Sequence, residues 1–318
     1  MSFKSNVLTG TALCLSLLLA GAAQAKEYRI SYIQGVTGNP FYTSVGCGAA
    51  EVAKTLGVKF DAQGPQQFSP QLQLRVLDAV IASHPDGIMI STTDPVALTG
   101  ALQQAKDMGI KILSIDGDVE DKSVAIANIQ SDNELGGANA GEFLAKSLGG
   151  KGEVMALMNS PASVVAQARV KGFVDTVAKY PGMTYLGVQY SNNQTAKAAS
   201  NVTATVAAHP NLAGVYAMST NNTEGAATGI REAQREGKIK LVGFDTSDPI
   251  VEAIRAGVVA GDIVQDPYRI GQLGLQMMVQ ALDGKPVERQ VRTTFVVATP
   301  QNVDTPEVQH YIYKTRCN

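Results

Sequence analysis

The 318-residue sequence predicts an α/β fold made of two similar lobes, each built on a doubly wound parallel sheet. Short apolar runs alternate with amphipathic stretches almost to the end of the chain. Short strands separated by helices of this length are typical of parallel sheets that helices cover on both faces. The series of elements also occurs twice, and a chain of this length normally forms two domains.

The first series of elements begins with YRISYIQ and continues through apolar runs such as DGIMIS. Between its first four strands lie amphipathic stretches long enough to form crossover helices. Strands are therefore expected at 28–34, 58–63, 86–91, 110–116 and 124–129, and helices at 41–55, 69–83 and 95–108.

The second series repeats the pattern, from GEVMALMN to VAGDIVQ. Its apolar runs have the length of buried strands, and helical stretches separate them. Strands are expected at 152–159, 183–190, 212–219, 239–246 and 259–265, and helices at 133–148, 162–180, 195–208, 223–236, 248–256 and 268–283.

Two pairs of segments match between the series. AVIASHPDGIMIS (79–91) is similar to TVAAHPNLAGVYAMS (205–219), in which a helix ends in Ala-x-His-Pro and a strand ends in Ser. KILSIDG matches KLVGFDT in the same order, with Asp116 and Asp245 at equivalent places. The offset between the series is nearly constant, so the two lobes should share one topology.

The matching aspartates each end the fourth strand of their series. In open parallel sheets, ligands bind beyond the carboxyl ends of the strands. If the lobes face each other, Asp116 and Asp245 approach one cleft from opposite sides. Asp is also a common helix N-cap after a strand, so the residues alone leave that second interpretation open.

The N-terminus has the features of a cleaved secretory signal peptide (residues 1–25). Lys4 precedes an apolar stretch at 7–20, and Ala23-Gln24-Ala25 is a small-x-small pattern that predicts cleavage after Ala25. No later stretch is long and apolar enough to span a bilayer. With a formal net charge of −2, the chain has no electrostatic footprint for nucleic acid. An exported protein of the periplasm is expected.

Two cysteines follow the signal segment, Cys47 and Cys317. In an oxidising compartment they could pair and tie the C-terminal tail to an early helix. The alternative is a buried Cys47 and a free thiol on a frayed tail. The histidines are scattered and no Cys/His cluster has metal spacing, so neither a metal nor a cofactor is expected.

Several motifs together resemble those of type I periplasmic sugar-binding proteins of ABC transporters, and the ribose- and galactofuranose-type members are the most similar. The motifs are NPFY, SIDG, QARVKGF, GFDTSD and DIVQDPYRIGQLG, and the resemblance covers essentially all of residues 26–300. The effector core of LacI-type repressors has the same fold, but a DNA-binding helix-turn-helix precedes it there. Here a signal peptide takes that place.

The resemblance implies two lobes joined by a hinge of three chain segments. It assigns 26–131 and 266–293 to the N-terminal lobe, and 132–265 and 294–318 to the C-terminal lobe. The chain would cross near Ser131–Asn133, Gln265–Asp266 and Thr294–Val297. Ligand contacts from both lobes would then stabilise the closed state over the open one.

The resemblance also implies a ligand set. Aromatic rings would stack on the sugar, carboxylates would accept from its hydroxyls, and an Arg would donate to its oxygens. The residues at the matching positions are Asn39, Phe41, Tyr42, Ser91, Asp116, Arg169, Gln194, Ser219, Asp245 and Gln265. Packing of the first helix by Phe41 and Tyr42, and a solvated Arg169, are the plain alternatives. Several relatives have Arg where this chain has Gly117, so the resemblance does not specify which sugar binds.

The function that follows is capture of one small neutral sugar or polyol by a monomeric binding protein, which delivers it to the membrane permease of an ABC importer without chemical change. Two other hypotheses remain. An exported enzyme could use Asp116 and Asp245 as an acid/base pair, as in glycoside hydrolysis. A chemoreceptor or sensor kinase could also read the closed form.

Overall fold

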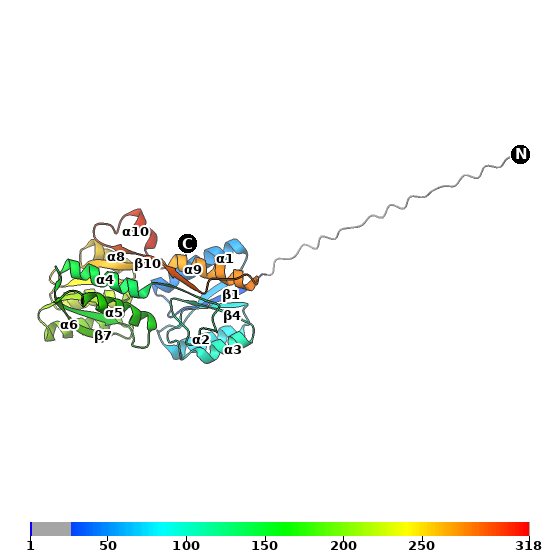
Figure 1. Cartoon of the computed structure of the whole chain (residues 1–318), viewed down its shortest axis with the longest axis horizontal. Helices are drawn as coiled ribbons and strands as arrows, with labels where there is room; N and C mark the ends of the chain where they lie inside the picture. The colour runs from blue at the N-terminus through cyan, green and yellow to red at the C-terminus, as the bar shows by residue number, and fades with distance from the viewer. Residues whose placement is uncertain (2–26, 318) are drawn as a thin grey trace.

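The computed structural model describes residue 1 and residues 27–317, and it shows two lobes side by side, each with a six-stranded sheet flanked by helices (Figure 1). The predicted α/β class with two parallel-sheet lobes is confirmed. The signal segment and its cleavage site lie outside the described residues. Within the described part of the chain, no helix is long and apolar enough to cross a membrane.

The sheet of the N-terminal lobe has the order β11-β5-β4-β3-β1-β2, and every pair of neighbours is parallel. Residues of its central strand β3 are all buried, as a strand covered by helices on both faces requires. The elements are β1 (Arg29–Ile33), α1 (Pro40–Leu56), β2 (Lys59–Gln63), α2 (Pro70–Ala82), β3 (Gly87–Ile90), α3 (Thr99–Asp107), β4 (Lys111–Ile115), β5 (Ala127–Ser131), α9 (Pro267–Leu282) and β11 (Gln290–Thr293).

The sheet of the C-terminal lobe has the order β12-β10-β9-β8-β6-β7. Its first five strands in sequence repeat the arrangement of β1 to β5, and only β12 is antiparallel to its neighbour. The elements are α4 (Asn133–Ser147), β6 (Lys151–Met158), α5 (Val164–Val177), β7 (Gly182–Tyr190), α6 (Thr195–Ala208), β8 (Leu212–Ala217), α7 (Thr220–Glu232), β9 (Lys240–Phe244), α8 (Asp248–Arg255), β10 (Val259–Gln265), β12 (Phe295–Ala298) and α10 (Pro306–Tyr311).

The chain passes between the two sheets three times, after β5, after β10 and at Thr294 between β11 and β12. The last two strands continue one another across the lobes, which explains why β11 is parallel and β12 antiparallel to its neighbour. These two edge strands and α10 were not predicted as elements, because each is short and has little apolar periodicity.

Helix starts at the ends of the strands are fixed by capping side chains. Asn39 accepts from the backbone N–H of Phe41, and Pro40 follows as the first residue of α1. Ser163 caps α5 and Ser247 caps α8 in the same way. Each cap closes a short loop between a strand and a helix, and these loops face the other lobe.

The first helix of the N-terminal lobe is also joined to the C-terminal tail. Cys47 on α1 forms a disulfide with Cys317. Of the two interpretations that the sequence left open, the structure has the bonded one.

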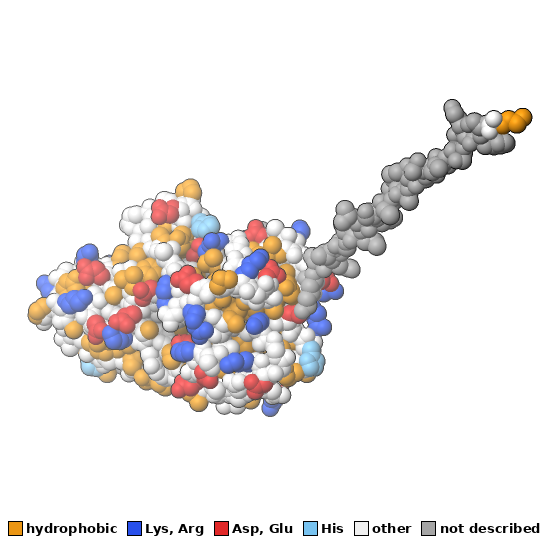
Figure 2. All heavy atoms as spheres, turned by 45° about the vertical axis from the view of Figure 1, so that its right-hand side comes forward, with side chains coloured by type: hydrophobic (Ala, Val, Ile, Leu, Met, Phe, Trp, Pro, Cys, Tyr) orange, Lys and Arg blue, Asp and Glu red, His pale blue; other side chains and the backbone are white. Residues whose placement is uncertain are grey.

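On the face shown in Figure 2, acidic and basic side chains are interspersed, as the small net charge leads one to expect.

Candidate functional site

A cavity lies between the lobes, and both lobes line it with loops that follow the carboxyl ends of their strands. The lining is mixed: carboxylates, a guanidinium, amides, hydroxyls and aromatic rings. The N-terminal lobe contributes Asn39, Phe41, Tyr42, Phe68, Thr92, Thr93, Pro95, Asp116 and Gly117, and the C-terminal lobe contributes Asn159, Ser163, Val164, Val165, Arg169, Asn193, Met218, Ser219 and Asp245.

The loops that reach the cavity correspond between the two lobes. In each lobe they follow the first, second, third and fourth strands of the series. The loop after β2 supplies Phe68 and the loop after β7 supplies Asn193. The internal repeat in the sequence therefore places equivalent loops on opposite sides of one cavity.

Asp116 and Asp245 follow β4 and β9 and adopt the same unusual backbone conformation. Their φ angles are 44° and 72°, in the left-handed region that Asp enters more readily than most residues. The backbone N–H of Asp116 donates to the carbonyl of Ile129, and that of Asp245 donates to the carbonyl of Ile263, each over 2.9 Å. The same backbone conformation and the same kind of backbone hydrogen bond therefore position the two carboxylates, one in each lobe.

Arg169 is buried on α5, with 2% of its surface exposed. Its Nε donates to Oδ1 of Asn133 over 2.9 Å, and its Nη1 donates to the carbonyl of Met218 over 2.9 Å. The guanidinium also lies over the ring of Phe244, 3.7 Å from the ring centre. Contacts within the C-terminal lobe therefore fix the direction of the guanidinium without help from a ligand.

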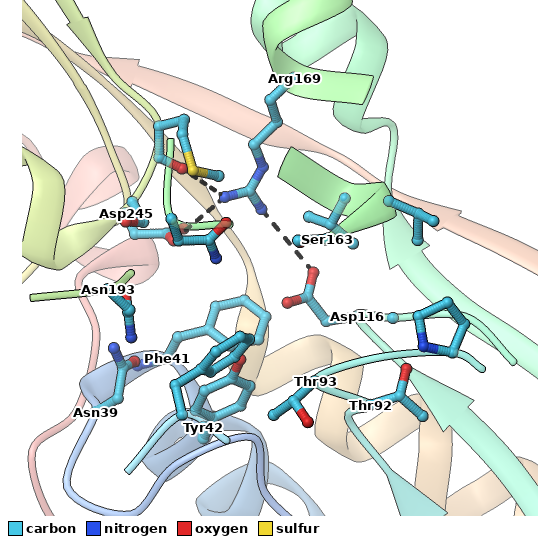
Figure 3. Close-up of a pocket in the computed structure, with 18 residues that line it drawn as sticks. Asn39, Phe41, Tyr42, Thr92, Thr93, Asp116, Ser163, Arg169, Asn193 and Asp245 are labelled. Atoms are coloured by element: carbon cyan, nitrogen blue, oxygen red, sulfur yellow. Dashed lines mark hydrogen bonds and ion pairs between the residues drawn. The ribbon is translucent and has the colours of Figure 1, made fainter. Parts of the chain in front are cut away.

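The guanidinium of Arg169 points between the two aspartates (Figure 3). Nη1 lies 3.5 Å from Oδ2 of Asp245, and Nη2 lies 3.9 Å from Oδ1 of Asp116 in the other lobe. Burial opposes the charge on Arg169, but the two carboxylates outweigh it and raise its pKa. One buried cation therefore faces a carboxylate from each lobe.

Asp116 is the less satisfied of the two acids. Its Oδ1 is buried and has no hydrogen-bond partner among the described residues. Burial raises the pKa of Asp116 to about 7, against the opposing effect of Arg169 and with a further contribution from Asp245. A donor placed in the cavity would satisfy this oxygen and favour the ionised carboxylate.

The carboxylate of Asp245 accepts two hydrogen bonds from residues on the side away from the cavity. Its Oδ1 accepts from Nε2 of Gln265 over 2.7 Å and from the hydroxyl of Tyr313 over 2.6 Å. Gln265 itself is fully buried and does not line the cavity. It lies behind the site and orients Asp245.

The first turn of α1 places two aromatic rings at the wall of the cavity. Phe41 and Tyr42 pack edge to face with ring centres 5.3 Å apart. Tyr42 closes over Gly35, where a Cβ atom would lie 2.6 Å from the Tyr42 hydroxyl. Burial and the charge of Asp116 raise the pKa of Tyr42, so the phenol stays protonated. The side chains of Asn39 and Asn193 approach each other beside these rings (Figure 3).

Besides Gln265, two more of the residues that the resemblance assigns to the site do not line the cavity. Ser91 is buried and its hydroxyl pairs with that of Tyr32 over 2.8 Å, whereas Thr92 and Thr93 line the wall. Gln194 lines an adjoining groove between the lobes, which shares Asn39, Phe68 and Asn193 with the cavity, whereas the neighbour Asn193 lines both. Both assignments differ by one residue from a lining position. Ser91 directly follows β3, where successive side chains point in opposite directions, and Gln194 is the N-cap residue of α6.

Sequence reasoning also missed several lining residues on the C-terminal lobe. Asn159 and Ser163 flank the turn after β6, and Val164 and Val165 begin α5. Their signal was available in the repeat, because this loop occupies the place that Asn39 to Tyr42 occupy after β1. The residue types in this loop differ from those in the NPFY segment after β1, so the resemblance between motifs does not identify them.

The arrangement suits a small, uncharged, polyhydroxylated molecule. Two carboxylates accept from hydroxyls, one guanidinium and three amides donate, and three aromatic rings offer apolar surface. Within the described residues, no group of three or more His, Cys, Asp or Glu side chains could hold a metal ion.

Comparisons with known proteins agree with this geometry. The profile of the periplasmic binding protein domain matches residues 30–286. The ribose import binding protein of Salmonella typhimurium is 28% identical over 290 residues, which are 91% of this chain and 96% of that protein.

Two solved structures are also similar over the same extent. An ABC transporter solute binding protein from Agrobacterium vitis, bound with α-D-tagatopyranose, has 35% identity and a TM-score of 0.89, and the match covers 91% of this chain and 100% of that one. A carbohydrate transporter solute binding protein from Agrobacterium radiobacter, in complex with D-arabinose, has 29% identity and a TM-score of 0.86, with 91% and 99% covered.

Proposed function

Because this chain belongs to the periplasmic binding protein family, we propose that its cavity holds a single monosaccharide between the lobes, with Asp116, Arg169 and Asp245 as the polar centre of the site. The protein is a sugar-binding component of an ABC importer, and its relatives are named as binding proteins and not as enzymes. Its partner is accordingly a membrane permease, and its place is the periplasm.

The observation that supports this site most strongly is the shared cation. Arg169 lies within 4 Å of carboxylates from both lobes, while Oδ1 of Asp116 has no hydrogen-bond partner among the described residues. A sugar hydroxyl that donates to this oxygen would satisfy a buried acceptor, which otherwise carries a desolvation cost. The same hydroxyl oxygen could accept from Arg169.

Other cavity residues have roles that follow from their chemistry. Phe41 and Tyr42 stack on the apolar face of the sugar ring, and Asn39 and Ser219 bond its outer hydroxyls. Gln265 acts through Asp245 and not by direct contact. Ser91 and Gln194, which were expected in the site, are not assigned to it.

We take the lobes to extend over 26–131 with 266–293 and over 132–265 with 294–318, and we take the protein to act as a monomer after removal of residues 1–25. A ligand that contacts both lobes stabilises the closed arrangement by its differential affinity for it. A permease that recognises the closed surface would then distinguish loaded from empty protein.

The proposal is tested by a thermal-shift screen with D-tagatose, D-arabinose and D-ribose, the sugars in the names of similar proteins. A sugar at 100 times its Kd should stabilise the folded state by about 2.7 kcal/mol. Calorimetry should then give one site per chain, and chromatography should return the sugar unchanged. Conversion of the sugar would instead support an enzyme, and an unchanged melting temperature with a wide panel of monosaccharides would reject the ligand class.

A further inference from the structure

The C-terminal segment that follows α10 crosses from one lobe to the other. It begins in the C-terminal lobe, where Val308 of α10 is buried. It ends on α1 of the N-terminal lobe, where Cys317 bonds Cys47. We call residues 312–317 the strap. It is a connection between the lobes in addition to the three chain crossings (Figure 1).

The middle of the strap is buried behind the site. Tyr313 is 4% exposed, and its hydroxyl donates to Oδ1 of Asp245 over 2.6 Å. The backbone N–H of Gln265 donates to the same hydroxyl over 3.3 Å, and the backbone N–H of Tyr313 donates to Oγ1 of Thr246 over 3.1 Å. The strap therefore contacts the loop after β9 through both its side chain and its backbone.

The same tyrosine also contacts the other wall of the cavity. Its ring packs edge to face against Phe41, with ring centres 5.8 Å apart. One side chain thus touches a carboxylate of the C-terminal lobe and an aromatic ring of the N-terminal lobe, and both of these line the cavity.

The end of the strap is fastened to α1. The backbone N–H of Lys314 donates to Oγ of Ser44 over 2.6 Å, and Nζ of Lys314 lies over the ring of Tyr268, 4.1 Å from its centre. The disulfide follows three residues later. The end of a chain normally frays unless it is tied down, and here a covalent bond fixes it four residues after Tyr313, the residue that contacts Asp245.

We propose that Tyr313 is a positioning residue for ligand binding, and that the Cys47–Cys317 disulfide keeps it against Asp245 and Phe41. Without the disulfide the strap leaves its place more often, and Asp245 then loses one of the two donors that hold its Oδ1. The position of the Asp245 carboxylate relative to Arg169 then becomes less defined, and the affinity of the protein for the sugar falls. This inference rests on the proposed sugar site.

The test is a double-mutant cycle on sugar affinity, measured by calorimetry at 10 °C with whichever of D-tagatose, D-arabinose or D-ribose binds. Tyr313→Phe keeps the ring and removes the hydroxyl, and the pair Cys47→Ser and Cys317→Ser removes the disulfide. Each should weaken binding about tenfold, the effect of one lost hydrogen bond to a charged group. Together they should weaken it by much less than the product of the two effects, because both act through one contact.

Tyr311→Phe is the matched control. It makes the same change two residues earlier, at a hydroxyl that faces Thr294 across 3.5 Å and lies outside the cavity, and it should leave affinity unchanged. If the disulfide only stabilises the fold, its loss lowers the melting temperature but not the affinity at 10 °C. That result, or full additivity of the two changes, overturns the proposal.

A measurement without sugar separates failure of this inference from failure of the proposed function. Amide hydrogen exchange of residues 245–247 should be faster in the cysteine-pair variant than in the wild type, because the strap covers this loop. Unchanged exchange there contradicts the strap proposal even if no sugar binds. If exchange is faster but none of the monosaccharides tested binds, the strap proposal holds and the proposed ligand class is rejected.

Discussion

Arg169 is a cation that the protein keeps almost entirely away from water. Such a charge is tolerated only when nearby groups compensate it, and removal of one partner then leaves a buried charge unpaired. Asn133, Met218 and Phe244 hold the guanidinium from within its own lobe, which leaves its outer edge directed at the carboxylates. A prepared donor of this kind loses little freedom when a ligand binds.

The raised pKa of Asp116 makes sugar affinity depend on pH. A hydroxyl that donates to the carboxylate favours its ionised form, so binding releases a proton wherever the free protein holds one. Since the pKa is about 7, affinity of the wild type should fall as the pH is lowered from 8 to 6. Asp116→Asn should bind more weakly and show little dependence on pH over that range.

Calorimetry in two buffers with different ionisation enthalpies measures the released proton directly. The wild type should release a proton at pH 6.5 and almost none at pH 8.5. Equal pH profiles for the wild type and Asp116→Asn would exclude Asp116 as the titrating group.

Asp262 on β10 should make stability depend on pH. It is fully buried, and neither carboxylate oxygen has a hydrogen-bond partner among the described residues. Burial, and then the charge of Asp245, raise its pKa well above the ordinary value. The folded protein therefore keeps a proton that the unfolded chain loses above about pH 4, so stability falls as the pH rises.

Asp262→Asn removes this proton uptake. Relative to the wild type, its free energy of unfolding should rise by up to about 1.4 kcal/mol per pH unit above pH 4 and should not change with pH below that value. Urea unfolding at pH 4, 5.5 and 7 measures the difference. A constant difference across the three values would show that Asp262 has the same pKa in both states.

Helices α4 and α5 pack with their backbones in close contact, and α5 carries Arg169. A Cβ atom at Gly172 would lie 1.9 Å from the carbonyl oxygen of Glu134, and one at Gly137 would lie 1.8 Å from that of Arg169. Glycine is required because backbone on each side leaves no room for a side chain. Glycine allows the same close contact between α1 and α9, at Gly48 and Gly271.

Gly172→Ala should therefore push α5 away from α4. We expect a loss of about 1–3 kcal/mol in the free energy of unfolding, as for other overpacked interiors, together with weaker sugar binding because Arg169 moves with its helix. Gly100→Ala on α3 is the control, since nothing lies within 4 Å of its Cβ position. It should raise stability by up to about 1 kcal/mol and leave affinity unchanged. Similar effects from both substitutions would refute this account of the helix contact.

The elements also show where prediction from sequence stops. The apolar runs were enough to identify the central strands, because a strand covered on both faces needs little else to be recognised. β11 and β12 depend on pairing with strands far away in the sequence, so no local pattern marks them. Ser91 and Gln194 belong to loops that do reach the site, but the direction of a side chain at the end of a strand or the start of a helix depends on geometry that the sequence does not specify.

At the scale of the whole molecule, the repeat explains the site. Two copies of one topology place equivalent loops opposite each other, and the matching pair Asp116 and Asp245 is recognisable from the sequence alone. The position of the strap behind the site cannot be predicted from the sequence in the same way. The two cysteines suggest a tie to α1, but nothing local indicates that Tyr313 lies against Asp245.

Whether the two lobes close on one sugar is tested most directly by a crystal structure of the protein with the sugar that stabilises it most. We expect one sugar between the lobes, with hydroxyls in hydrogen-bond range of Asp116, Arg169 and Asp245 and its ring against Phe41 or Tyr42. A sugar bound elsewhere, or one that contacts a single lobe only, would contradict it.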